Sequence, residues 1–153
     1  MTATRPRAID PHEALALMRE GYLYVDVRSV PEFDAGHPEG AYNLPWREPS
    51  PRGMRDNPEF LNVARAALAR SQPLIVGCQA GARALAAATA LLADGYLHVV
   101  HQAAGYGGVR DPFGRVQQPG WQACGLPCAT QASAGRSYAA LCAQRRASSP
   151  VID

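Results

Sequence analysis

Short apolar runs alternate with amphipathic stretches along the first two thirds of the chain. The apolar runs are bounded by glycine, proline or polar residues, a pattern that predicts buried strands at 22–27, 73–78 and 98–101. Between and before these runs, apolar residues recur every three or four positions and predict helices over about 10–20, 57–68 and 83–93. This alternation of strand and helix is typical of an α/β domain with a mainly parallel sheet.

Local signals fix some boundaries of these elements. Asp10 can cap the first helix, with Pro11 at its first position and Glu13 closing a capping box. Asn57-Pro58 predicts the start of the second helix. Residues 28–56 are rich in proline, glycine and charge and predict mostly loop, while residues 103–127 are rich in glycine and proline and are expected to wrap back over the domain.

The C-terminal segment differs in pattern from the rest. The length fits one domain, and a tail of different pattern begins at about residue 129. Tyr138, Leu141 and Cys142 can form one helical stripe, which predicts a short helix docked on the domain. A frayed tail and a dimer contact are the alternatives.

Composition narrows the range of functions. The chain has 153 residues and a net charge of +2, and all 15 basic residues are arginine, as in proteins from GC-rich bacterial genomes. The absence of lysine excludes a Schiff-base lysine and a phosphate-loop lysine. The scattered arginines give no nucleic-acid footprint. We expect no signal peptide and no membrane span, and therefore a cytoplasmic protein whose four cysteines stay reduced.

The segment with the clearest chemistry runs from Val76 to Leu85. Cys78 ends a predicted buried strand, and a helix begins about five residues later, after a connection of small residues that includes Gly81. Backbone N–H groups in such a turn can converge, and the helix N-terminus adds partial positive charge. A thiolate at Cys78 would be stabilised there, and Arg83 is the cation within the segment. The alternative is a buried structural cysteine.

Four motifs in order match one known family. They are Asp26-Val-Arg28 with Glu32-Phe33, Gly36-His-Pro-Glu-Gly-Ala41 with Asn43-Leu-Pro45, Cys78-Gln-Ala-Gly-Ala-Arg83, and Gly120-Trp121 with Gly125-Leu-Pro127. Over residues 8–130 the chain resembles a single-domain rhodanese, a sulfurtransferase, which implies one domain there and a C-terminal tail over 131–153. It departs from the family pattern at Pro38-Glu39, where Ile-Pro is usual, and at 103–106, where Ala-Ala-Gly-Tyr replaces a Gly-Gly pair.

The resemblance implies a three-layer fold, with a central, mainly parallel sheet flanked by helices, and a persulfide mechanism. Cys78 would take sulfane sulfur from thiosulfate or a similar donor and pass it to cyanide, a small thiol or a protein thiol, without a cofactor. The loop residues would bind the sulfur or its donor; they are Gln79, Ala80, Gly81, Ala82 and Arg83. Arg83 would orient the donor's sulfonate or anchor the loop.

Two other functions stay open. Related phosphatases and arsenate reductases use a seven-residue Cys-x5-Arg loop, whereas Cys78 to Arg83 is six residues and favours sulfur over a tetrahedral oxyanion. A persulfide carrier or regulatory binding module without turnover is the second alternative.

Other polar residues have supporting interpretations. Asp26 and Arg28 are expected to form an ion pair at the rim of the site, and Glu32 could pair with Arg28 or Arg83. A structural hydrogen bond is expected for His37, and none of the four histidines has zinc-ligand spacing. Cys124 and Cys128 are interpreted as a chance pair, with a resolving thiol as the minor alternative.

Overall fold

A computed structural model describes residues 5–148. Its centre is a five-stranded sheet in the order β1-β8-β7-β2-β4, in which every neighbouring pair is parallel. The strands are β1 (Arg7–Ile9), β8 (Val99–Gln102), β7 (Leu74–Gly77), β2 (Leu23–Asp26) and β4 (Tyr42–Asn43). The expected α/β class with a parallel sheet is therefore confirmed.

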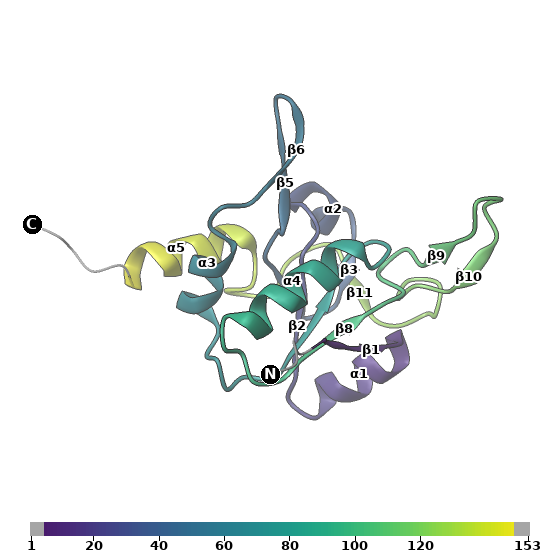
Figure 1. Cartoon of the computed structure of the whole chain (residues 1–153), viewed down its shortest axis with the longest axis horizontal. Coiled ribbons are helices and arrows are strands. Elements are labelled where there is room, and N and C mark those ends of the chain that lie inside the picture. The colour runs from purple at the N-terminus through teal and green to yellow at the C-terminus, as the bar shows by residue number, and fades with distance from the viewer. Residues whose placement is uncertain (1–4, 149–153) are drawn as a thin grey trace, which may run out of the picture.

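Helices cover both faces of this sheet and make three layers (Figure 1). The helices are α1 (Pro11–Arg19), α2 (Val30–Ala35), α3 (Phe60–Ala67), α4 (Ala82–Ala93) and α5 (Tyr138–Ser148). Alternate residues of β2 enter different cores: Val25 packs in the cluster with α3, α4 and α5, and Tyr24 in the cluster with α1 and α2. Strands buried on both faces explain the continuous apolar runs in the sequence.

The observed start of the first helix agrees with the start predicted from the sequence, and that of the second differs from it. The capping box of Asp10 and Glu13 is present at α1, with Pro11 in the first turn, as expected. The second helix begins at Phe60 rather than at Asn57-Pro58. The Asn57 side chain instead accepts from the Glu59 N–H and donates to the Pro45 carbonyl, so it shapes the turn before the helix.

The prediction that 28–56 is mostly loop was wrong. This segment holds α2, β4, β3 (His37–Pro38) and the hairpin of β5 (Arg47–Ser50) and β6 (Gly53–Asp56). The hairpin strands have no buried face, so they lack the apolar alternation that marks a strand in the sequence. Among the described residues, the strands of this hairpin pair only with each other, and they project from the domain (Figure 1).

Residues 103–127 also contain paired strands. β9 (Val109–Arg110) and β10 (Val116–Gln118) form a second projecting hairpin (Figure 1), and β11 (Cys128–Ala129) pairs with β3. Through this pairing the chain returns to the motif that contains His37, with Ala129 opposite His37.

The tail forms a helix that packs on the domain. α5 lies beside α3 (Figure 1), and Leu141 is fully buried in the same core cluster as Phe60. The part of the predicted tail at 149–153, and residues 1–4 of the expected leaderless start, lie outside the described residues. Within 5–148, no helix has the length and apolarity to cross a membrane.

Candidate active site

The chemistry-bearing residues meet at one edge of the central sheet, where the parallel strands end. β2 and β7 are in register, with Asp26 opposite Gly77, and β4 follows with Asn43 opposite Asp26. Cys78 comes directly after β7. The carboxyl ends of parallel strands are where α/β proteins place their sites, and the first and third sequence motifs are brought together there.

The Cys78 sulfur receives backbone hydrogen bonds. The Gly81 N–H donates to Sγ at 3.0 Å, and the Ala84 N–H donates at 3.3 Å. Both amides belong to the start of α4, whose first N–H groups have no partner inside the helix and whose N-terminus carries partial positive charge. Cys78 is 2% exposed. The arrangement stabilises negative charge on the sulfur.

Two glycines allow this tight turn. Gly81 has φ of 105°, a left-handed conformation that favours glycine, and a Cβ there would lie 2.6 Å from the Ala103 carbonyl oxygen. Gly77 has no such φ, but a Cβ on it would overlap the Tyr24 hydroxyl. The backbone around Cys78 is therefore packed against its neighbours at a distance that only glycine permits.

A second segment holds the loop from the other side. The Tyr106 N–H donates to the Cys78 carbonyl at 2.7 Å, and the Gly107 N–H donates to the Gln79 carbonyl at 3.0 Å. The buried Gln102 side chain fixes this segment by accepting from the Gly105 N–H and donating to the Gly105 carbonyl, both at 2.9 Å. The conformation of the Cys78 loop thus depends on residues 102–107.

Asp26 and Arg28 form a buried ion pair at the rim, with both side chains almost inaccessible. Arg28 Nη2 donates to Asp26 at 2.7 Å and to the Gly36 carbonyl at 2.6 Å, and Nη1 donates to the Gln79 side-chain oxygen at 3.2 Å. The guanidinium also stacks 4.4 Å from the centre of the Tyr106 ring. This arginine therefore links three loops.

Glu32 pairs with Arg83 rather than with Arg28. The two bonds, at 2.7 and 3.0 Å, are bidentate, and the Ser29 N–H and hydroxyl also donate to Glu32. The bond from Arg83 lowers the pKa of Glu32 from 4.5 to about 2. Ser29 and Glu32 also form the capping box of α2, so the pair joins the starts of α2 and α4.

An open depression of about 510 Å³ lies at the mouth of the loop. Its lining includes Arg28, Glu32, Gln79, Tyr106 and Gln122. Burial, together with the neighbouring Cys128 thiol, raises the pKa of Tyr106 to about 12, so its hydroxyl keeps its proton at neutral pH.

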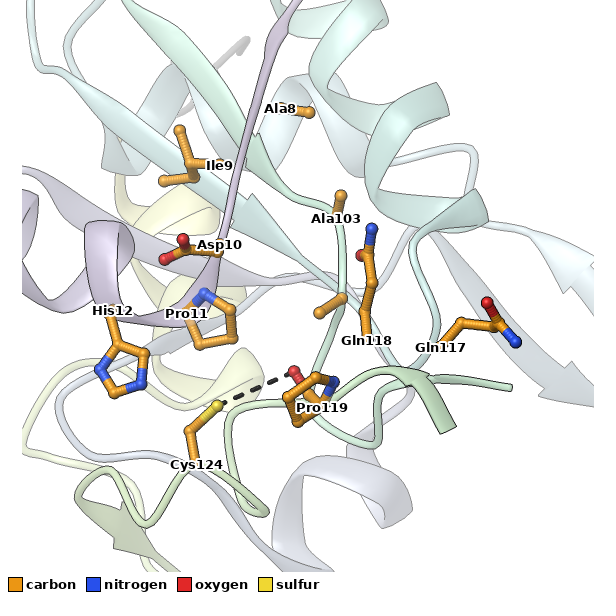
Figure 2. Close-up of a pocket in the computed structure, with 11 residues that line it drawn as sticks. Ala8, Ile9, Asp10, Pro11, His12, Ala103, Gln117, Gln118, Pro119 and Cys124 are labelled. Atoms are coloured by element: carbon orange, nitrogen blue, oxygen red, sulfur yellow. Dashed lines mark hydrogen bonds between the residues drawn. The ribbon is translucent and has the colours of Figure 1, made fainter. Parts of the chain in front are cut away.

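A separate hollow of about 460 Å³ lies between β1, the start of α1 and the end of β10 (Figure 2). In Figure 2 the Cys124 thiol faces the Pro119 carbonyl, and Gln118 lies on the other side of Pro119. None of the loop residues 78–83 lines this hollow, whereas Gln79 lines the depression described above, so the hollow lies outside the candidate site.

The structure brings the residues of the predicted site together, but they differ from one another in exposure and contacts. Gln79, Ala80 and Ala82 are exposed on the loop, while Gly81 caps α4. Ala84, whose N–H donates to the Cys78 sulfur, lies one residue beyond the predicted loop. The sequence could not single it out, because a backbone N–H does not depend on the type of side chain. Tyr106 and Gln122 were also missed. The one relevant sequence signal was the departure from Gly-Gly at 103–106.

The remaining candidates lie in structural positions. His37 is fully buried, with Nδ1 2.7 Å from the Phe33 carbonyl and its ring stacked on Phe33. In the part of the chain that the structure describes, no three histidine, cysteine or acidic side chains are grouped to hold a metal ion. Cys128 is exposed and lies beside Tyr106, whereas Cys124 lines the hollow of Figure 2.

The family model for the rhodanese-like domain matches residues 10–111, which include Cys78 and its loop. The chain belongs to this family. It is 40% identical over 101 residues to thiosulfate sulfurtransferase 18 of Arabidopsis thaliana, covering 65% of this chain and 74% of that protein. It is 34% identical over 112 residues to protein HIGH ARSENIC CONTENT 1, mitochondrial, of the same plant, covering 69% of this chain and 66% of that one.

The fold of this rhodanese-like domain also matches solved structures. Rv0390 from M. tuberculosis superposes with a TM-score of 0.71 at 26% identity, covering 84% of this chain and 100% of that chain. That match covers more of this chain than the 102 residues of the family model, so the solved structure also has an equivalent for part of the chain outside residues 10–111.

Proposed function

We propose that this rhodanese-like domain is a sulfurtransferase that carries sulfane sulfur on Cys78, from thiosulfate or a similar donor to cyanide or a thiol. The observation that supports this most is the pair of N–H groups on the Cys78 sulfur at the start of α4. A relative at 40% identity named thiosulfate sulfurtransferase supports the same activity.

In the first step the Cys78 thiolate attacks the outer sulfur of thiosulfate. A Cys78–sulfur bond forms while the sulfur–sulfur bond of thiosulfate breaks, and the electron pair leaves with sulfite. Cys78 then carries a persulfide with one negative charge on its terminal sulfur. The N–H groups of Gly81 and Ala84, already aimed at the sulfur, oppose the cost of negative charge in a buried site.

In the second step the acceptor attacks the terminal sulfur of the persulfide. The sulfur–sulfur bond breaks, its electron pair returns to the Cys78 sulfur, and the thiolate is restored. Cyanide leaves as thiocyanate, and a thiol leaves as a persulfide that takes the thiol proton. Donor and acceptor thus use one site in turn, which predicts ping-pong kinetics.

Of the two roles considered for Arg83, its geometry favours anchoring. Its guanidinium is bonded at both ends to Glu32, so it joins the loop to α2 rather than presenting an unpaired charge to the donor. Asp26 and Arg28 support the rim in the same way, through a buried pair that reaches Gln79. A reducing compartment such as the cytoplasm would keep the Cys78 thiol free.

Intact-mass analysis after incubation with thiosulfate tests the proposal. We expect a gain of about 32 Da, one sulfur atom, on the nucleophile, together with release of sulfite. Cys78→Ser should lose both, whereas Cys124→Ser, which changes a free thiol in the separate hollow of Figure 2, should keep both. Sulfur loading that survives in Cys78→Ser would overturn the assignment.

The same preparations separate the alternatives. A carrier would load sulfur once but show no turnover with cyanide or small thiols. An enzyme for oxyanions would release phosphate from para-nitrophenyl phosphate or reduce arsenate, which the six-residue loop disfavours. Turnover of either oxyanion without sulfur loading would replace the proposed function.

A further inference from the structure

The depression at the mouth of the Cys78 loop continues into a second one. The second has a volume of about 290 Å³ and shares four lining residues with the first. The shared residues are Ala35, Gly36, Tyr106 and Gln122, and the second depression extends to β11 with Cys128, Ala129 and Thr130. We call the two together the acceptor trough. Its first part alone falls in the range of roughly 300–1,000 Å³ that is typical of sites for drug-sized ligands. This volume is much larger than thiocyanate or thiosulfate requires.

The walls of the acceptor trough are polar but hold little free charge. Arg28 and Glu32 are the charged residues among those that line it. Arg28 is neutralised by Asp26 through three side-chain bonds, and Glu32 by Arg83 through two. A small dianion therefore meets no unpaired guanidinium among the lining residues.

The neutral groups that remain suit an amide chain. Gln122 carries a carboxamide, which both donates and accepts hydrogen bonds. The Gln79 carboxamide oxygen already accepts from Arg28, so Gln79 adds mainly its NH2 donors, and Tyr106 adds a hydroxyl. The Gln122 backbone N–H donates to the Tyr106 carbonyl at 3.3 Å, which fixes this exposed glutamine between the two depressions. Ala35 and Ala129 give small apolar surface beside these groups. Peptide backbone presents the complementary mixture of donors, acceptors and small side chains.

Building on the proposed function, we propose that the acceptor trough binds the peptide portion of a thiol acceptor, and that Gln122 is the residue that gives a peptide thiol its advantage over cyanide or a small thiol. The acceptor's cysteine enters the mouth, and its neighbouring residues lie along Gln122 toward β11. The transfer itself is the second step described above, with the peptide cysteine as attacking sulfur and a peptide persulfide as product.

Transfer from the loaded enzyme tests the preference. Cys78 persulfide is formed with thiosulfate, or with inorganic polysulfide, and its decay is followed by intact mass with three acceptors: acetyl-Ala-Cys-Ala-amide, 2-mercaptoethanol and cyanide. In Gln122→Ala we expect the KM for the peptide to rise about 3- to 10-fold, the effect of one lost hydrogen bond, with kcat unchanged and both small acceptors unaffected. Gln118→Ala, which alters the hollow of Figure 2, is the matched control and should change nothing.

A binding measurement keeps this inference separate from the proposed function. Calorimetry with the S-methylated peptide, which cannot accept sulfur, should give a Kd that rises by the same factor in Gln122→Ala and not in Gln118→Ala. If Cys78 never loads sulfur but this dependence is seen, the proposed function fails and the subsite stands. If Cys78 loads normally and the peptide gains nothing over 2-mercaptoethanol, or Gln122→Ala binds and reacts as the wild type does, the subsite is refuted.

Discussion

Replacing Gly81 with alanine should disturb the Cys78 site through backbone strain and through a clash with Ala103. A matched Gly→Ala variant that has the strain but not the clash separates the two effects. Gly81 has φ of 105°, and Gly21, at the end of α1, has φ of 106°. A residue with a side chain pays about 1–2 kcal/mol for left-handed backbone. A Cβ at Gly21 meets no atom within 4 Å, but a Cβ at Gly81 lies 2.6 Å from the Ala103 carbonyl oxygen.

The difference between the two variants measures the contact with Ala103. We expect Gly21→Ala to lose about 1–2 kcal/mol of unfolding free energy, and Gly81→Ala to lose a further 1–3 kcal/mol, roughly the cost of forcing extra atoms into a packed site. Urea unfolding followed by tryptophan fluorescence gives both values, because Trp121 is fully buried.

Sulfur loading should separate the variants more sharply than stability does. Relieving the overlap moves the Gly81 N–H away from the Cys78 sulfur, which it now contacts at 3.0 Å. A hydrogen bond to a charged group is worth roughly 1.5–3 kcal/mol, or about 10- to 100-fold in rate. Gly81→Ala should therefore load sulfur from thiosulfate at least 10-fold more slowly, while Gly21→Ala loads at the wild-type rate. Equal losses of stability and equal loading rates in the two variants would refute the argument.

Three further changes test the surrounding structure. Glu32 has a pKa of about 2 in the fold against an ordinary 4.5. Its pairing with Arg83 therefore stabilises the protein fully above pH 4.5, and this stabilisation is lost as the pH falls toward 2. Between pH 4.5 and 2, the unfolding free energy of Glu32→Gln should fall less steeply than that of the wild type. Asp26→Asn leaves Arg28 buried without its counter-charge and should cost about 3–5 kcal/mol in urea unfolding, and a loss under 1 kcal/mol would show that the pair is not buried in solution. Leu141→Ala should cost about 2–5 kcal/mol if α5 is part of the core, and a neutral result would mean that the tail is only loosely attached.

The elements around Cys78 could be predicted because their signals are local. The runs that end at Asp26 and Cys78 are buried on both faces, so apolar content alone marks them as strands. The parallel arrangement then places Asp26 and Arg28 beside Cys78, whatever the sequence distance between them. Gly81 could be predicted as a turn residue for the same reason, because its left-handed backbone conformation serves a turn formed within a few residues.

Other parts of the site depend on contacts that leave no local pattern. Gln102 and Tyr106 act on the Cys78 loop through one side-chain amide and one backbone N–H, and any residue except proline at position 106 would supply the latter. The hairpins β5–β6 and β9–β10 are largely exposed, so hydrophobic periodicity gives them no mark. The choice of Arg83 over Arg28 as the partner of Glu32 depends on how α2 is docked, which local sequence does not determine.

The backbone bonds from Tyr106 and Gly107 to the Cys78 loop also have a consequence for biosynthesis. These bonds span 28 residues of sequence, and the pairing of β8 with β7 brings Gln102 into place beside them. During translation, Cys78 therefore leaves the ribosome as an unsupported thiol and acquires its support only after the chain through Gly107 has emerged and closed over it. A nascent or truncated chain that lacks this segment would lack the two bonds that hold the Cys78 loop, so its cysteine would be an ordinary thiol rather than one prepared for sulfur transfer.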